Sequence, residues 1–359
     1  MKNLLSFLLF LVLLVLLGSC SGRTERGLTT GDTIHFRYAR LLTVVQNGNE
    51  VEITVKNPWQ RSSANFPDTS ILRRIRLQIP VRNAGVYSIV HAALMRELNS
   101  VDAVGGICDV QYLTDSLILA GVHNGSIVDM GSSMQPSIEH IIKLGPDVLL
   151  SSPYEGQQMN DKLEKLGIPI LECADYMEVF PLARAEWIRL FGILLGKQEM
   201  ADSIFASVES RYNSLRQKAA EAKTHPTLLA ERPYQGIWNV PCSGSTTARL
   251  YADAGARYLF ADLEGTGVKP LSIEQILDRA IGADFWLIKS FGPLTRQQID
   301  ADFPALKPIR ASLLVCNSSS SEYFQEIPFH PDLLLENLVA ILHPELGIKA
   351  QKSYFAINP

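Results

Sequence analysis

The sequence predicts an α/β protein made of two lobes of similar plan, with a long helical connector between them and a β-hairpin in front. Three observations predict this organisation. Apolar strand-like runs alternate with helical stretches over 86–181, and the same alternation restarts over 225–359. Helical periodicity fills 182–224, the roughly forty residues between the two blocks. The pattern Ser-Ile-Glu, followed by an amphipathic stretch, occurs at Ser137 and again at Ser272.

The first twenty residues have the pattern of an export signal. A single Lys precedes a nearly unbroken apolar run that ends in small residues, and we therefore assign 1–19 as a secretory signal peptide. The run LGSC at 17–20 resembles a bacterial lipobox, which implies cleavage before Cys20 and acylation of its thiol, palmitate being the typical acyl group. An uncleaved transmembrane anchor is the alternative. Either interpretation puts the rest of the chain outside the cytoplasm.

The segment before the first lobe predicts a tether and a small β structure. Residues 20–33 are polar and rich in Gly and Thr, which suits a flexible, lipidated tether. Over 34–85 apolar and polar residues alternate, and an Asn-Gly pair at 47–48 separates two such runs, which is a strong β-hairpin signal. "ILRRIRLQIP" at 71–80 alternates again and predicts a further strand.

The two lobes are predicted to contain parallel sheets, because single helices separate their strands. The expected strands of the first lobe are VYSIV (86–90), DAVGGI (102–107), DVLLSS (147–152) and IPILEC (168–173). Those of the second are TLLAE (227–231), DFWLIKS (284–290) and ASLLVC (311–316). In the connector, apolar side chains at spacings of three and four predict one buried face made of Met200, Ile204, Val208, Tyr212 and Leu215. Gly196 predicts a break ahead of that face.

Composition argues against a nucleic-acid partner, indicates two domains and leaves the state of the cysteines open. The 359 residues carry a net charge of only −4, with Lys and Arg scattered, which argues against a nucleic-acid partner. About 340 residues after the signal are too many for one ordinary core, so two domains are expected. Beyond Cys20 there are four cysteines: Cys108, Cys173, Cys242 and Cys316. They could form disulfides in one of three pairings or stay as buried free thiols.

The duplicated Ser-Ile-Glu pattern places an acid at the same point of each lobe. Ser137 and Ser272 occupy N-cap positions, where the hydroxyl bonds a free backbone N–H of the first turn. Glu139 and Glu274 follow in that turn, where an acid contributes ~0.3–1 kcal/mol through the helix dipole alone. The duplication favours a second role: two carboxylates on one surface would suit a two-subunit partner with basic residues.

Candidate ligand-binding residues follow the carboxyl ends of the predicted strands, where open α/β sheets bind their ligands. They are His91, Tyr154, Glu155, Arg232, Tyr234, Trp238, Phe291 and Tyr323. The stretch "AERPYQGIWNVPCSGS" at 230–245 is the most informative, because aromatic rings suit a flat or bulky ligand and Arg pairs with its carboxylate or phenolate oxygens. The alternatives are structural: Trp238 fills the lobe's edge, Arg232 makes a surface pair and His91 caps a helix.

Several segments together carry a family resemblance. They are "SIEHIIKLGPDVLLSS", "LEKLGIPIL", "IRLFGILLGKQEMAD", "PLSIEQILDRAIGADFW" and "PDLLLENLVAILHPE". In their order and spacing the chain resembles, over 86–359, the substrate-binding lipoproteins of ABC importers of the iron-chelate and cobalamin type. The resemblance implies two Rossmann-like lobes joined by a long rigid helix, with ligand between them. It also implies that Glu139 and Glu274 match the lobe-surface glutamates that salt-bridge to arginines of the permease.

The resulting expectation is a non-catalytic, monomeric receptor without cofactor, held by its lipid on the periplasmic side of the envelope. It would deliver an iron chelate, either a siderophore or haem, to a permease dimer and its ATPase. The hairpin region 34–85 resembles extensions of iron-complex lipoproteins from Bacteroidetes-type bacteria, which favours iron over cobalamin, the alternative cargo.

Three other functions remain as weaker alternatives. A receptor for bare zinc or manganese would need converging ligands, whereas the seven histidines are well separated. An enzyme is disfavoured because GxxxxGK[ST], GxSxG and HExxH are all missing, although "CSGS" at 242–245 superficially suggests a nucleophile. A purely structural surface lipoprotein would not need two lobes.

Overall fold

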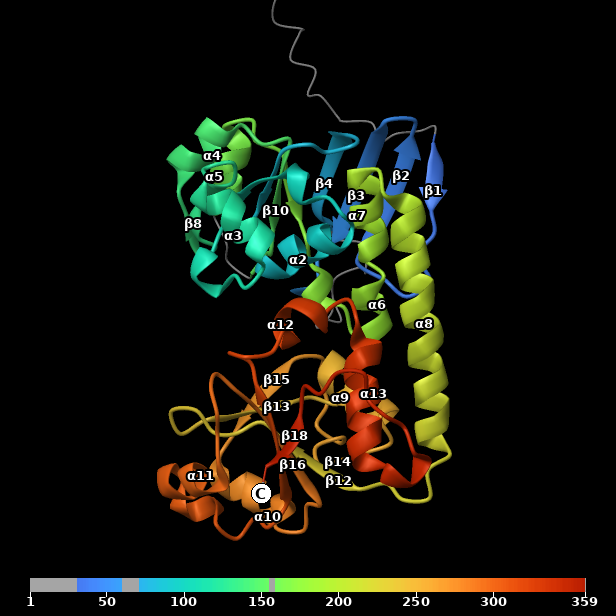
Figure 1. The fold of residues 1–359 in the computed structure, drawn as a ribbon, viewed down its shortest axis with the longest axis vertical. Helices are drawn as coiled ribbons and strands as arrows, with labels where there is room; N and C mark the ends of the chain where they lie inside the picture. Colours follow the sequence, from blue (N-terminus) through green and yellow to red (C-terminus); the bar gives the residue numbers. More distant parts are fainter. Residues whose placement is uncertain (1–30, 60–70, 155–158, 359) are drawn as a thin grey trace, which may run out of the picture.

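The computed structural model describes residues 31–59, 71–154 and 159–358. The predicted signal peptide and two predicted site residues, Cys20 and Glu155, lie outside these ranges. Two α/β lobes follow one another along the long axis, and helix α8 (Gln198–Ala220) runs beside both of them (Figure 1). The predicted two-lobe α/β fold with a long connecting helix is therefore correct.

The N-terminal extension is a four-stranded antiparallel sheet rather than a lone hairpin. Its strands, in both chain and sheet order, are β1 (Asp32–Ile34), β2 (Leu42–Asn47), β3 (Glu50–Lys56) and β4 (Ile71–Gln78). The predicted hairpin is β2–β3, in which Asn47 pairs with Glu50. Gly48 in its turn has a φ of +58°, a left-handed conformation that favours glycine.

The first lobe contains a parallel five-stranded sheet in the order β11-β10-β5-β6-β7. Its strands are β5 (Ala84–Val86), β6 (Val104–Ile107), β7 (Val128–Asp129), β10 (Val148–Ser151) and β11 (Ile170–Glu172). Its helices are α2 (Ile89–Glu97), α3 (Ser116–His123), α4 (Ile138–Leu144) and α5 (Met159–Lys165), and a short hairpin joins β8 (Gly131–Ser132) to β9 (Gln135–Pro136).

The predicted strand VYSIV (86–90) is correct only at Val86, because β5 ends there and a helix begins at Ile89. The Ser88 hydroxyl accepts a hydrogen bond from the N–H of Val90 (3.3 Å) and so caps α2, which begins at Ile89. The apolar pair Ile89–Val90 thus belongs to a helix, because capping by Ser outweighs the β-branched run.

The connector consists of α6 (Pro181–Ala185), α7 (Ile188–Leu195) and α8. Gly196 ends α7 in a left-handed conformation, so the predicted break is correct. Helix α8 packs against α7 and α13 (Pro331–Leu342). The predicted buried face is wrong at Met200, which is exposed; the face is instead formed by Ala201, Phe205, Val208, Tyr212, Leu215 and Ala219.

The second lobe has a five-stranded sheet in the order β14-β12-β16-β17-β18, parallel except for β18. Its strands are β12 (Thr227–Ala230), β14 (Arg257–Tyr258), β16 (Phe285–Ser290), β17 (Ser312–Asn317) and β18 (Ala356–Asn358). A separate antiparallel pair joins β13 (Trp238–Pro241) to β15 (Val268–Leu271). The remaining helices are α9 (Thr246–Asp253), α10 (Ile273–Ala280), α11 (Arg296–Asp302) and α12 (Tyr323–Glu326).

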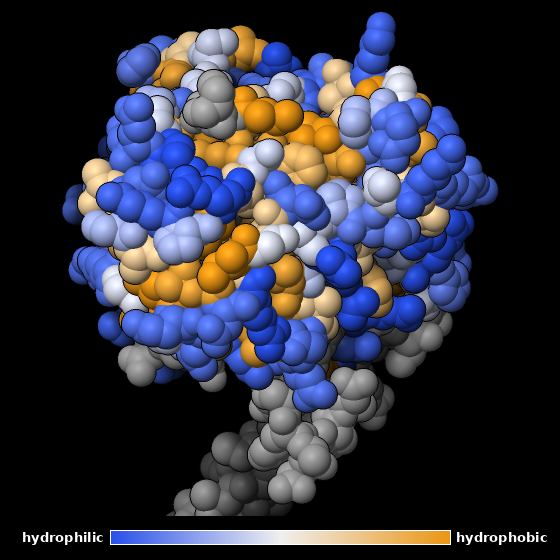
Figure 2. All heavy atoms as spheres, turned by 90° about the horizontal axis from the view of Figure 1, so that it is seen from below, coloured by the Kyte–Doolittle hydropathy of each residue, from blue (hydrophilic) through white to orange (hydrophobic). Residues whose placement is uncertain are grey.

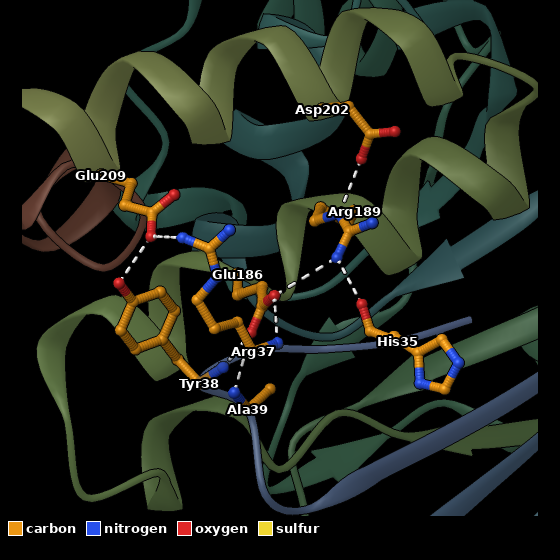
Figure 3. Close-up of polar contacts among 8 residues, drawn as sticks. All are labelled: His35, Arg37, Tyr38, Ala39, Glu186, Arg189, Asp202 and Glu209. Atoms are coloured by element: carbon orange, nitrogen blue, oxygen red, sulfur yellow. Dashed lines mark hydrogen bonds and ion pairs between the residues drawn. The ribbon is translucent and has the colours of Figure 1, made fainter. Parts of the chain in front are cut away.

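The N-terminal sheet is fastened to the connector by buried carboxylates (Figure 3). The Glu186 carboxylate accepts hydrogen bonds from the backbone N–H groups of Arg37 (2.7 Å), Tyr38 (2.7 Å) and Ala39 (2.9 Å). Arg189 donates to the same carboxylate (3.2 Å) and to the carbonyl of His35 (2.8 Å). The chain leading into β2 is thereby held on α6 and α7 by side chains nearly 150 residues away.

Three further properties concern the cysteines, the surface and the helices. Cys108, Cys173, Cys242 and Cys316 are buried free thiols, which settles the question of disulfides. Seen from the end formed by the second lobe, the surface is mainly hydrophilic, with hydrophobic areas between the polar side chains (Figure 2). Within the described ranges, no helix combines the length and apolar character needed to cross a bilayer.

Candidate ligand-binding cleft

Two adjoining cavities lie between the lobes and form one cleft. The larger has a volume of about 640 Å³ and the smaller about 330 Å³. Both are lined by Tyr176 from the first lobe and by Thr246, Thr247 and Lys289 from the second. Their sizes fall within the range of roughly 300–1,000 Å³ that is usual for small-molecule sites.

The carboxyl ends of the strands bring the polar groups to this cleft, as expected for parallel sheets. Glu231 and Arg232 directly follow β12, and Lys289 is the penultimate residue of β16. In the first lobe, the chain after β11 leads through Asp175 to Tyr176. Both sheets therefore direct these ends toward the same gap.

Lys289 and Glu231 form an ion pair in the wall shared by the two cavities. Lys289 Nζ lies 2.5 Å from Glu231 Oε1, and both side chains are 22% exposed. Burial disfavours the charge on Lys289, but the Glu231 carboxylate attracts the ammonium and accepts its hydrogen bond, and the lysine's pKa is raised, so the ammonium stays charged. Glu231 adopts a left-handed φ of +65°, which is rare for a residue with a side chain. Its backbone is fixed there because its N–H donates to the Leu287 carbonyl and its own carbonyl accepts from Trp286 Nε1.

Arg184 is held at the wall of the smaller cavity by a buried carboxylate. Its Nε donates to Asp175 Oδ2 (2.9 Å), and Asp175 Oδ1 lies 2.9 Å from His91 Nε2. Burial works against the Asp175 charge, but Arg184 and His91 more than offset it and lower the pKa of this carboxyl. The carboxylate therefore remains ionised and fixes the orientation of the guanidinium.

Aromatic side chains supply much of the remaining wall. Those in the smaller cavity are Tyr176, Tyr251, Tyr323, Phe324 and Phe355, and Tyr234 belongs to the larger one. The Tyr323 ring meets Phe324 and Phe355 edge to face, with centroids 5.2 and 5.8 Å apart. Burial raises the pKa of the Tyr251 and Tyr323 hydroxyls, so both stay neutral and can donate hydrogen bonds.

Three predicted ligand-binding residues come together here. Arg232 and Tyr234 line the larger cavity, and Tyr323 lines the smaller one. Tyr154 and Phe291 are 37% and 81% exposed, and neither is among the residues that line the two cavities.

Two other predicted ligand residues prove to be buried structural groups. Trp238 is fully buried, stacks on Trp286 with centroids 5.7 Å apart and donates from Nε1 to the Ala230 carbonyl (3.0 Å). Its ring is core, because the β13–β15 pair turns it inward. His91 is 1% exposed and supports Asp175 from behind, so the prediction that it faces ligand is also wrong.

Sequence reasoning missed several cleft residues. Lys289 and Glu231 carried a usable signal, because each is a charged residue at the carboxyl end of an apolar predicted strand. Arg184, Tyr176 and Thr246 carried none, since they lie in a helix, a short turn and a helix start without a distinctive pattern.

The paired glutamates lie where the duplicated pattern puts them in each lobe. The Ser137 and Ser272 hydroxyls accept hydrogen bonds from the N–H groups of His140 (3.2 Å) and Gln275 (3.4 Å), so both predicted caps are present. Glu139 and Glu274 are exposed in the first turns of α4 and α10. These two helices lie toward opposite ends of the long axis, on the side of the molecule away from α8 (Figure 1).

The described ranges contain no group of three or more histidine, cysteine or acidic side chains that could hold a metal ion. The polar residues that line the cleft include cations, tyrosines and threonines, together with Asn239, Ser245 and the Glu231 carboxylate. Such a set suits a ligand that carries anionic oxygens and aromatic or bulky parts.

Comparison with known proteins identifies similar chains. A family model described as periplasmic binding protein matches residues 110–311, more than half of the chain. An uncharacterized lipoprotein of Methanocaldococcus jannaschii is 28% identical over 296 residues, which cover 79% of this chain and 70% of the relative.

Two solved structures share the fold. A periplasmic heme binding protein from Pseudomonas aeruginosa has a TM-score of 0.59 at 17% identity, covering 78% of this chain and 98% of that one. A structure from an ABC-type Fe3+-hydroxamate transport system of Saccharomonospora viridis has a TM-score of 0.59 at 19% identity, covering 80% and 98%.

Proposed function

Because the chain belongs to the periplasmic binding protein family, we propose that it is the solute receptor of an ABC importer and holds an iron chelate between its lobes. The observation that carries the proposal is the cleft shared by the two lobes, where Arg184, Arg232 and Lys289 stand among tyrosines. The chelate is a siderophore or haem. The names of the two similar structures support this cargo class, and the chemistry of the cleft agrees with it.

The three cations have different tasks in this proposal. Asp175 already neutralises Arg184, and Glu231 neutralises Lys289. Arg184 and Lys289 therefore present fixed hydrogen-bond donors to the ligand. Arg232 makes no hydrogen bond or ion pair with the part of the chain that the structure describes. It is therefore the cation available to a carboxylate, hydroxamate or propionate oxygen of the cargo. The tyrosine rings would cover the bulky part of the ligand.

In the same proposal, the protein lies on the outer side of the cytoplasmic membrane. The apolar segment ending at Cys20, and a relative that is a lipoprotein, support a lipid anchor at Cys20. As a monomer, the receptor would reach a permease dimer, which works with its ATPase. Glu139 and Glu274, exposed at matching positions of the two lobes, are the proposed docking residues.

Equilibrium binding to the purified protein tests the cargo. The panel comprises ferric hydroxamate and catecholate siderophores, haem, cyanocobalamin and zinc, measured by calorimetry and by tryptophan fluorescence. We expect saturable binding of at least one iron chelate. Cyanocobalamin as the single binder would exchange the cargo for a corrinoid, and zinc as the single binder would refute the proposal.

Substitution of Arg232 locates the site. Losing a charge-assisted hydrogen bond costs about 1.5–3 kcal/mol, so Arg232→Ala should weaken binding by roughly tenfold or more. Arg310→Ala, which removes an exposed arginine elsewhere in the same lobe, is the matched control and should leave the affinity unchanged. Equal affinities of the two variants would place the cargo elsewhere.

A further inference from the structure

A second large groove lies on the second lobe, apart from the cleft. Its volume is about 1150 Å³, and none of its lining residues lines either interlobe cavity. Its walls come from the carboxyl-terminal part of α8, from α9 and from the segment around β14. The proposed cargo site gives this groove no role.

Small residues make up much of the lining of this groove. They are Ala220, Ala248, Ala252, Gly255, Ala256 and Ala261. Longer polar side chains also line it, among them Asn213 and Gln217 of α8. A groove of this volume exceeds the usual range of roughly 300–1,000 Å³ for small-molecule sites, so it suits an extended, partly hydrated ligand.

The charged groups of the groove are predominantly basic. Arg216 from α8, Arg249 from α9 and Arg257 from β14 line it, against a single carboxylate, that of Asp253. That carboxylate accepts a hydrogen bond from the Tyr212 hydroxyl (2.7 Å). Three cations and one anion leave a net charge of +2 along the groove.

The guanidinium groups of the groove have few hydrogen-bond partners. Within the described ranges, the guanidinium groups of Arg216 and Arg257 form no hydrogen bond and no ion pair, although Asp253 attracts Arg216 and Asp284 attracts Arg257 at longer range. Arg249 lies over the Phe180 ring at 4.3 Å, and its Nε donates a long hydrogen bond to the Gly244 carbonyl (3.4 Å). The Asp253 carboxylate acts on Arg216 and Arg249, but one carboxylate offsets only one of the three positive charges. The remaining positive charge favours an anionic ligand, and the arginine fork matches phosphate and carboxylate oxygens.

We propose that the groove between α8 and α9 binds a small polyanion that carries phosphate or carboxylate groups. The ligand would contact the small lining residues and would bind Arg216 of α8 together with Arg249 of α9 and Arg257 of β14. Two sources could present such groups: a free polyanion in solution and the headgroup of an anionic lipid. Both use the same contacts, and the experiment separates them.

The test measures binding of pyrophosphate and of citrate to the purified full chain by calorimetry at low ionic strength. The wild type should bind at least one of them saturably, and the affinity should fall as salt screens the charges. Arg216→Ala with Arg257→Ala should weaken binding at least tenfold. Lys307→Ala with Arg310→Ala removes two exposed cations from the same lobe and should change the affinity less than twofold.

A second variant keeps the test decisive if the double variant folds poorly. Ala252→Glu puts a carboxylate at an exposed lining residue of the groove, where glutamate suits the helix, and it should also weaken binding at least tenfold. Cargo binding in the cleft should be unaffected by either variant. That independence separates failure of this inference from failure of the proposed transport function.

Vesicles of phosphatidylglycerol and of phosphatidylcholine identify the source. Sedimentation with the anionic vesicles alone, lost in the Arg216/Arg257 variant and kept in the Lys307/Arg310 control, would assign the groove to a lipid headgroup. Saturable pyrophosphate or citrate binding would assign it to a free polyanion. Binding that is equal in the variant and in the control, or no binding of any probe, would overturn the inference.

Discussion

Glu186 and Glu178 are buried acids whose main partners are backbone N–H groups of the N-terminal extension. The Glu186 carboxylate accepts hydrogen bonds from the backbone N–H groups of residues 37–39. The Glu178 carboxylate accepts from the N–H groups of Arg40 and Leu41, both at 2.9 Å. A buried carboxylate tolerates the loss of water when several donors replace it, and these donors are fixed in the backbone. These two side chains therefore join the extension to the connector as one folded body.

Removing the Glu186 carboxylate should destabilise the protein strongly. Glu186→Ala leaves three backbone N–H groups and the Arg189 guanidinium without this acceptor, at about 1–3 kcal/mol for each buried group left unsatisfied. We expect a loss of about 3 kcal/mol or more in the free energy of unfolding, measured by urea denaturation, and a smaller loss for Glu186→Gln. Asp202→Ala, which removes a 48% exposed partner of Arg189, should cost less than about 1 kcal/mol. A loss for Glu186→Ala as small as that of the control would contradict this account.

The residue scale is also where sequence reasoning was least accurate. Trp238 and Arg232 stood in one informative segment, yet Arg232 reaches the cleft while Trp238 stacks on Trp286 inside the lobe. Composition identified the segment, but the orientation of the Trp238 ring depends on the β13–β15 pairing with residues about thirty positions away. The position of the Arg184 guanidinium depends in the same way on its contact with Asp175, which in turn contacts His91. No local sequence pattern predicts these contacts.

Whole elements were more predictable, because their signals are local. Gly196 ends α7, and Ser137 and Ser272 cap α4 and α10, as their positions predicted. The errors arose where two local signals competed: Ser88 starts a helix inside an apolar run that predicted a strand. Strand β1 and the register of the four-stranded sheet were not predicted, since long-range pairing sets them.

Helices α2 and α12, together with the start of α13, form a direct contact between the lobes. His330 Nε2, at the N-terminus of α13, lies 2.8 Å from Glu97 Oε1 at the end of α2. Thr114 and Gln325 also bond across the lobes, with Gln325 Nε2 donating to Thr114 Oγ1 (3.1 Å). The strength of this contact between the lobes therefore depends on the charge of the His330 imidazole.

The His330–Glu97 pair should make that contact dependent on pH. Burial disfavours the charged ring, but Glu97, with Asp332 and Glu326 nearby, outweighs burial and raises the pKa of His330 above 6.5. Since the folded pKa is the raised one, the stabilisation is fully present below pH 6.5 and is lost as pH rises through the raised value. A proton NMR titration of the His330 ring should show the raised pKa, and Glu97→Gln should lower it. Glu345→Gln, a change near the other end of α13, should leave it unaltered; an unchanged value in Glu97→Gln would contradict the argument.

At the scale of the molecule, each lobe presents an exposed glutamate in the first turn of a helix that starts from the same Ser-Ile-Glu pattern. A permease dimer also has two similar halves. A receptor with a single docking acid could form a salt bridge with only one half at a time. Charge pairs at the edge of an interface mainly set orientation and association rate. Both glutamates together would therefore fix how the cleft faces the transporter.

Glu139→Ala combined with Glu274→Ala should reduce uptake of the cargo at least tenfold in vesicles reconstituted with the cognate permease and ATPase, with each single variant in between. Cargo affinity should stay within twofold of the wild type, because both side chains are exposed and neither lines the cleft. Glu199→Ala with Glu264→Ala removes two exposed acids at other places and should transport normally. Lost cargo affinity would mean that the glutamates act on the cleft and not on docking. Undiminished transport by the Glu139/Glu274 variant would mean that the permease recognises another surface, because a two-point electrostatic dock cannot work with both points removed.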